Sequence, residues 1–173
     1  MSDQMYLLIF RLLHIVCGVF WAGSVFYTAL FIIPAAKASG PEGTKFMQQL
    51  GKTKYPIFIM IAAIITIFAG LMIMWKLSGG FEPAWFSAPY AQVLSTGSIL
   101  AIIAFIIGFT VNRPAAIRME KIGKAVEQAG VAPTAEQMKE LMMLRNRLFK
   151  ATNFIAVLLA ITVISMSIFR YVS

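Results

Sequence analysis

Long apolar runs separated by short polar segments dominate the chain. Between residues 57 and 75, for example, Thr66 is the only polar side chain. A helix rises about 1.5 Å per residue, so about 20 residues cross the roughly 30 Å hydrocarbon layer of a membrane. Because backbone groups in lipid need partners within their own segment, such runs must be helical. The pattern predicts an all-α polytopic membrane protein, a four-transmembrane-helix bundle in one domain (1–173), with helices at about 5–33, 56–75, 88–112 and 150–171.

Prolines predict where three of these helices begin or end. Pro56 suits the first turn of the second helix. Pro34 is expected to end the first helix, and Pro114 to kink or break the third, because proline lacks an N–H and clashes with the preceding turn.

The polar segment 114–150 is predicted to form a helical hairpin. Its first part contains good helix formers and stops at Gly130. Residues 134–137 then read Thr-Ala-Glu-Gln, a capping box that opens a new helix. The second arm of the hairpin is expected to continue into the fourth transmembrane helix.

A weak internal repeat relates the two halves of the chain. Pro34-Ala35-Ala36 follows the first helix, and Pro114-Ala115-Ala116 follows the third. The run 58–67 (FIMIAAIITI) also resembles 154–164 (FIAVLLAITVI). Such echoes arise easily in apolar sequence, but they would suggest two parallel helix pairs related by an axis along the membrane normal.

Charge is low overall and is concentrated between the apolar runs. Only 13% of the residues are charged against 60% hydrophobic, and fifteen Lys and Arg outnumber seven Asp and Glu. Twelve of the fifteen basic residues lie in the first and third connecting segments, whereas the second has only Lys76 and Glu82. The positive-inside rule therefore predicts both termini outside and the hairpin in the cytoplasm. With no nucleic-acid-binding motif present, this charge is interpreted as a topology signal and as contact with anionic lipid.

His14 is the only histidine and lies inside the first predicted helix. Arg11 and Cys17 lie one turn on either side, and Trp21 two turns on, so the four share one helix face. An ionisable residue inside a membrane span usually faces the bundle interior or a wet cavity. Two interpretations stay open. In the first, His14 is part of a ligand site. In the second, Arg11 extends to the outer lipid headgroups and His14 forms a hydrogen bond with a neighbouring helix.

Matching depths along the helices predicts which residues lie level with His14. Gly70 is expected to leave space for a flat ligand. Gln92 and Thr96 are expected to form part of a polar wall on the third helix. Met72 and Met166 are the nearby sulfur ligands that the second and fourth helices offer.

Two cofactors suit these residues. Haem b iron can be held by one His, or by His with Met, here His14 with Met166 or Met72, while Arg11, Lys76 or Arg170 could neutralise the propionates. A bis-His haem within one chain is excluded, because there is no second histidine. Alternatively, Cu(I) prefers sulfur and imidazole ligands, which His14, Cys17 and Met72 or Met74 would provide.

A third hypothesis is a non-catalytic membrane subunit or scaffold. Its cytoplasmic hairpin would dock a protein partner or take part in a homo-oligomer, and His14 would be structural. A single cysteine excludes an intrachain disulfide. The sequence contains no P-loop, no GxSxG and no His/Cys zinc spacing.

The first helix resembles the opening helix of the CopD-like and HemJ-like bacterial membrane proteins. The residues that carry this resemblance are Leu13-His14, Trp21-Ala22-Gly23, Phe26-Tyr27 and Pro34, with Lys54-Tyr55-Pro56 and Ala69-Gly70-Leu71 in the second helix. The resemblance implies a four-helix protein of the bacterial inner membrane with His14 as the matching histidine. HemJ-like proteins are associated with haem b and protoporphyrinogen oxidation, and CopD-like proteins with copper uptake. The segment after Tyr27 lacks the Arg and further His of the HemJ-like group, so a member of the broader superfamily is expected.

Overall fold

The computed structural model describes residues 2–172, in which there is no strand. Its elements are α1 (Asp3–Tyr27), η1 (Thr28–Ile32), α2 (Ile33–Ala38), α3 (Gly40–Lys52), α4 (Tyr55–Leu77), η2 (Pro83–Ser87), α5 (Pro89–Ile107), η3 (Gly108–Asn112), α6 (Arg113–Ala129), α7 (Ala135–Ile168) and η4 (Phe169–Tyr171). Four helical stretches are long and apolar enough to cross a membrane, Asp3–Ala38, Tyr55–Leu77, Pro89–Ala129 and Ala135–Tyr171. The all-α architecture and the four apolar helices predicted from the hydropathy pattern are confirmed.

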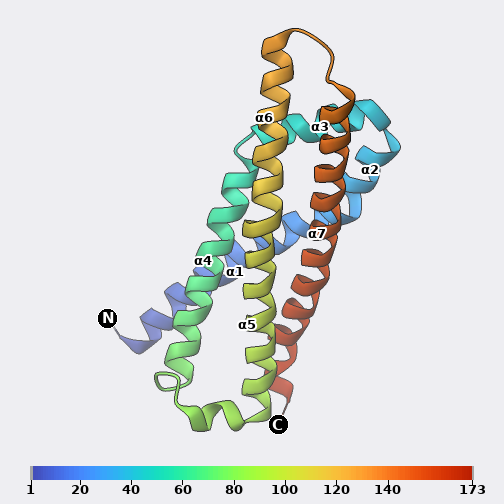
Figure 1. Cartoon of the computed structure of the whole chain (residues 1–173). Helices are drawn as coiled ribbons and strands as arrows, with labels where there is room; N and C mark the ends of the chain where they lie inside the picture. The colour runs from blue at the N-terminus through green and yellow to red at the C-terminus, as the bar shows by residue number, and fades with distance from the viewer. Residues whose placement is uncertain (1, 173) are drawn as a thin grey trace.

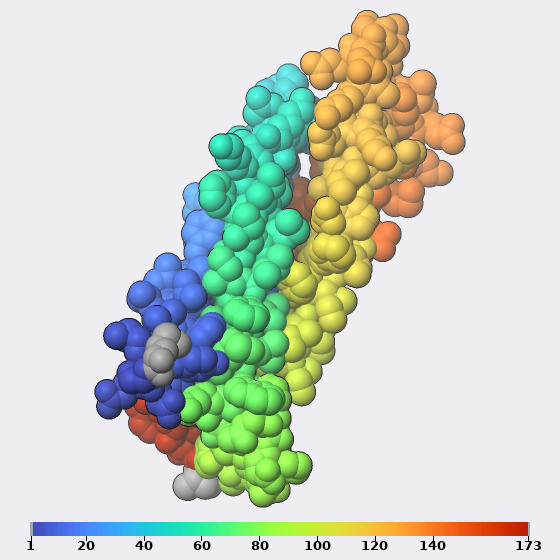
Figure 2. All heavy atoms as spheres, turned by 90° about the vertical axis from the view of Figure 1, so that its left-hand side faces the viewer, coloured from blue at the N-terminus to red at the C-terminus, as the bar shows by residue number. Residues whose placement is uncertain are grey.

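The bundle consists of two closely packed helix pairs, α1 with α4 and α5 with α7. Fewer contacts join one pair to the other. In Figure 1, both termini lie at the lower end and the α6–α7 hairpin projects at the upper end. Figure 2 shows the blue N-terminal turns of α1 lying against the green part of α4.

All four long helices contribute to one buried core at mid-height. Small residues form the α4 and α5 parts of this core, so the backbones approach closely there. The cluster contains Trp21, Ala22 and Val25 of α1, Ala62 and Ala63 of α4, Ala101 and Ala104 of α5, and Ile155, Leu158 and Leu159 of α7.

The first span does not end at Pro34, which corrects the end expected there, and helix also continues past Pro114, so the kink or break expected at that proline is not a break. A five-residue π-helix precedes each proline, and helix continues beyond it. The N–H of Ile33 donates to the carbonyl of Thr28, and that of Arg113 to the carbonyl of Gly108. These bonds reach back five residues instead of four, so the register shifts where the proline would otherwise clash with its preceding turn.

The predicted hairpin is confirmed. Gly130 ends α6 in the left-handed conformation, with φ of 63°, which glycine adopts without steric cost. Thr134 and Gln137 form both hydrogen bonds of the capping box at the start of α7. Arg118 on α6 binds Glu140 on α7 through two hydrogen bonds of 2.6 and 3.0 Å, which join the two arms.

The first basic segment is also helical, which the sequence pattern did not indicate. Helix α3 turns back so closely on α2 that a Cβ on Gly43 would lie 2.0 Å from the carbonyl oxygen of Ala36. Arg145 of α7 donates to the hydroxyl of Thr44 at 2.7 Å, so α3 is tied to the hairpin.

The two halves share more than the short sequence echo. Each π-helix ends two residues before its Pro-Ala-Ala segment. Four buried positions also recur at the same spacing in α4 and α7, within and just after the two echoing runs. These positions are Ala62, Ala63, Thr66 and Ala69 on α4, and Leu158, Leu159, Thr162 and Ser165 on α7. The helix pairs α1–α4 and α5–α7 therefore have the same local design.

Candidate functional site

His14 contacts the neighbouring helix α4 through a short hydrogen bond. Its Nδ1 lies 2.7 Å from the backbone carbonyl oxygen of Thr66, and the side chain is partly buried. A carbonyl oxygen can only accept, so Nδ1 must carry the proton in the neutral ring. The lone pair of that ring is then on Nε2, which is the atom left to bind a metal or accept a second hydrogen bond.

Gly70 makes this contact possible. A Cβ at residue 70 would lie 2.8 Å from Cε1 and 3.0 Å from Nδ1 of His14. Any side chain at this position would therefore collide with the imidazole. Gly70 does lie level with His14, as depth matching predicted, but the expected space for a flat ligand is filled by the histidine ring itself.

The side chain of Thr66 is itself engaged in the α1–α4 interface. The hydroxyl donates to the carbonyl of Ala62 at 2.7 Å. Its methyl group lies 3.4 Å from where a Cβ on Gly18 would stand, so α1 and α4 are in close contact one turn beyond His14. The side chain is only 7% exposed, and the position of the accepting carbonyl is thus held by packing.

Cys17 and Trp21 lie on the α1 face that turns toward the core. Trp21 is 5% exposed and belongs to the central cluster, against which the partly buried thiol of Cys17 packs. The structure thus places Trp21 among the packing residues of all four helices, and Cys17 between that core and His14 along α1.

On the other side of His14, aromatic contacts close the α1–α4 interface. The ring of Tyr6 lies 4.6 Å from that of Phe10, and Phe10 lies 6.1 Å from Phe68 of α4, measured between ring centroids. The hydroxyl of Tyr6 donates to the carbonyl of Met72 at 3.2 Å. Met72 is therefore in the same interface, further along α4 than Thr66 and Gly70, at the level of Tyr6.

Arg11 is the exposed cation next to His14. No ion pair involves its guanidinium among residues 2–172. Lys76 instead binds Asp3 at 2.8 Å, and Arg170 lies over the ring of Phe169. Of the three cations considered for propionates, Arg11 alone makes none of these contacts within that range.

Met166, Gln92 and Thr96 belong to other surfaces. Met166 packs in the α5–α7 interface, its Cγ 3.7 Å from the position of a Cβ on Gly97. Gln92 and Thr96 are exposed, and each donates to a backbone carbonyl of its own region, at Ser87 and Gln92 respectively. The structure therefore does not show the polar stripe of α5 as a wall beside His14.

A second polar cluster, which the sequence did not single out, joins the first π-helix to α4. The hydroxyl of Thr28 is hydrogen-bonded to that of Tyr55. Both hydroxyls also donate to the carbonyl of Ser24, at 2.8 Å from Thr28 and 3.3 Å from Tyr55. The second π-helix is tied to α7 in a similar way, by a 3.1 Å bond from Asn112 to Thr152. The sequence signal was a polar side chain, Thr28 or Asn112, placed within six residues before each proline, which is too common to be diagnostic.

Within residues 2–172, no three His, Cys, Asp or Glu side chains are grouped so that they could hold a metal ion. His14 and Cys17 are two such residues, and a copper site would need methionine sulfur besides. The chain matches no protein-family model, and searches of curated proteins and of solved structures find no match. The function must therefore be argued from the chain's own residues.

Proposed function

We propose that this chain is a multi-pass membrane protein that binds haem b through Nε2 of His14 and has a redox or porphyrin-related role. The observation that carries this proposal is the hydrogen bond from Nδ1 to the carbonyl of Thr66. Histidines that bind metals almost always donate their other ring nitrogen in this way, which fixes the tautomer and the orientation of the ring.

The surroundings of His14 agree with the needs of a haem. One histidine is sufficient to hold the iron, and Nε2 is its available nitrogen. Arg11, one turn away and exposed, could pair with a propionate. A haem at this position would supply one-electron redox chemistry. The chain would hold it through His14, whose ring occupies the space that Gly70 leaves open.

The membrane setting follows from the four apolar helices and the distribution of charge. We infer that both termini lie outside and that the α6–α7 hairpin lies in the cytoplasm, because its residues are rich in Lys and Arg. The resemblance of α1 to CopD-like and HemJ-like proteins supports placement in a bacterial inner membrane.

A visible absorption spectrum of the detergent-purified protein, supplied with haem, tests the proposal. We expect a Soret band that His14→Ala abolishes and that Cys17→Ala, one turn away, leaves unchanged. The variant Met72→Leu examines a sixth ligand, since its loss would shift the band without removing haem, whereas Met166→Leu in the α5–α7 interface should leave the band unchanged. A wild-type protein that takes up no haem would refute the proposal.

Copper binding is the second candidate, because the half-buried thiol of Cys17 lies one turn from His14 on the same helix. In that case the purified protein would take up no haem and would stay colourless, but it would bind Cu(I) stoichiometrically. Both His14→Ala and Cys17→Ala would then reduce Cu(I) binding. If neither ligand bound, His14 would be a structural residue and the scaffold hypothesis would remain.

A further inference from the structure

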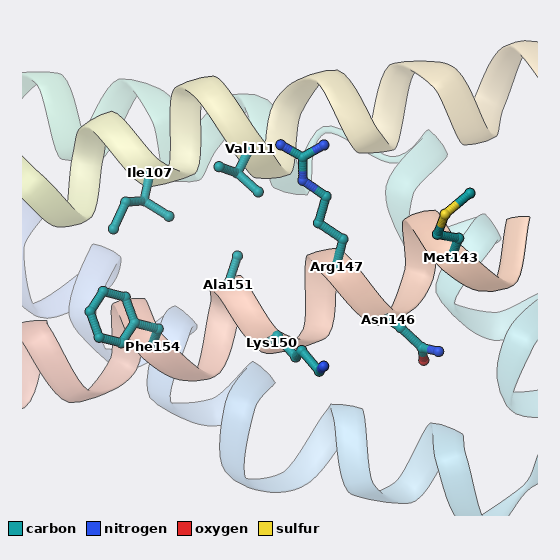
Figure 3. Close-up of a pocket in the computed structure, with 8 residues that line it drawn as sticks. All are labelled: Ile107, Val111, Met143, Asn146, Arg147, Lys150, Ala151 and Phe154. Carbon is teal, nitrogen blue, oxygen red and sulfur yellow. The ribbon is translucent and has the colours of Figure 1, made fainter. Parts of the chain in front are cut away.

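A groove of about 580 Å³ lies between α7 and the end of α5 with its π-helix η3. Its floor is apolar and consists of Ile107, Val111, Ala151 and Phe154. Figure 3 shows Ile107 and Phe154 together at one end of the groove, with Arg147 toward the other end. The volume is within the range of about 300–1,000 Å³ that is typical of small-molecule sites.

The groove has an apolar end and a basic end. On α7, Arg147, Lys150 and Phe154 are spaced by three and four residues, so they follow one stripe of the helix. Phe154 is seven residues from Arg147, which is about 10 Å along a helix. A ligand that fills the groove must therefore be charged at one end and apolar about 10 Å away.

The basic end has no acidic partner of its own. Within residues 2–172, the ion pairs join Lys45 to Glu42, Lys76 to Asp3, Arg118 to Glu140 and Lys124 to Glu120. Neither Arg147 nor Lys150 takes part in one, and Asn146 adds a further polar group beside them. This end of the groove is therefore complementary to an anion.

The position of the groove along the bundle selects the kind of anion. Phe154 begins the apolar part of α7, whereas Lys150 and Arg147 lie in its polar part. The groove therefore crosses the level where hydrocarbon gives way to headgroups. An inorganic anion would leave the apolar floor uncovered, and an acidic peptide would have to enter the hydrocarbon layer.

We propose that this groove binds an anionic phospholipid of the leaflet that faces the α6–α7 hairpin. Its phosphate lies beside Arg147, which Figure 3 shows projecting from α7 toward Val111, and the upper part of one acyl chain covers Val111, Ile107 and Phe154. The inference rests on the membrane setting that it shares with the proposed function, and it does not depend on haem or on which side of the membrane the hairpin occupies.

Binding of dioleoyl phosphatidylglycerol to the full-length protein in detergent, followed by native mass spectrometry, tests the site. We expect tighter retention of this lipid than of dioleoyl phosphatidylcholine. The double variant Arg147→Gln/Lys150→Gln removes two cations, each contributing about 1 kcal/mol near a membrane surface, so phosphatidylglycerol binding should weaken by about 10- to 30-fold. The matched control Lys52→Gln/Lys139→Gln removes the same charge from exposed positions outside the groove and should leave binding within about two-fold.

Two further measurements separate the groove from general charge attraction. Phe154→Ala should weaken phosphatidylglycerol binding but leave any effect of added inorganic phosphate unchanged. Equal losses in the groove variant and the control, equal binding of the two lipids, or competition by inorganic phosphate as strong as that by the lipid would each overturn the proposal. In haem-loaded samples, both double variants should keep the Soret band of the wild-type protein. A missing Soret band in the wild type would therefore count against the haem proposal and not against the lipid site.

Discussion

The imidazole of His14 occupies the space that a side chain on residue 70 would need. A Cβ on Gly70 would stand 2.8 Å from Cε1 of the ring. The same close approach lets Nδ1 reach the carbonyl of Thr66 one turn earlier on α4. The absence of a side chain on one helix thus sets the orientation of the only histidine on the other.

Gly70→Ala should displace the His14 ring and break its hydrogen bond. The added methyl group overpacks the α1–α4 interface, so we expect a loss of about 1–3 kcal/mol in the free energy of unfolding. Denaturant unfolding in detergent measures this change, and the Soret band of haem-loaded protein should weaken with it. Gly23→Ala is the matched control, since nothing lies within 4 Å of its Cβ position; a similar loss there would show that the effect is not specific to His14.

The tautomer of His14 can be observed directly, because the chain contains no other histidine. In protein labelled with ¹⁵N-histidine, the haem-free sample should show one ring with a protonated Nδ1 and an unprotonated Nε2. Solid-state or solution nitrogen NMR gives this result without any assignment. A ring protonated at Nε2 would contradict the hydrogen bond to Thr66 and would leave Nε2 without the lone pair that the haem proposal requires.

Thr28→Val should weaken the attachment of the first π-helix to α4. The variant removes the hydroxyl that meets Tyr55, and interhelical hydrogen bonds in membranes contribute about 0.6 kcal/mol on average. A double-mutant cycle with Tyr55→Phe, followed by unfolding in detergent, should give a coupling energy of about that size. Thr110→Val in the second π-helix is the control, because Thr110 is exposed and donates only within its own helix, to Ile106.

Cysteine labelling tests the membrane topology. In a Cys17→Ala background, a cysteine at Gln128 in the hairpin should resist an impermeant thiol reagent in intact cells and react after lysis. A cysteine at Glu82, in the connection between α4 and α5 at the opposite end of the bundle, should react in intact cells. The reverse pattern would invert the proposed orientation.

Sequence reasoning succeeded where the determining interactions are local. The start of α4 beside Pro56, the end of α6 at Gly130 and the capping box at Thr134 each depend on a few neighbouring residues. It failed at Pro34, where helix continues, because a π-helix is a change of register that leaves no distinct residue pattern.

The candidate site was only partly accessible from sequence. His14 and Gly70 could be paired by depth, since both positions can be counted from helix ends. The outward orientation of Gln92 and Thr96 could not be foreseen, because hydrocarbon-facing and core-facing positions of an apolar helix carry similar side chains. Their hydroxyl and amide groups bond to their own backbone, which removes the need for an interior partner.

The pattern of residues was sufficient to establish that four apolar helices form and where most of them begin. It also established that a capped hairpin lies between the third and fourth apolar helices. Hydropathy and capping act over a few residues, and every helix can satisfy its own backbone without the others. Only the tertiary structure decided which way each helix is rotated about its axis. Helix rotation depends on the packing of residues far apart in the chain. It brings Nδ1 of His14 to Thr66 and places Arg147 and Ile107 in one groove.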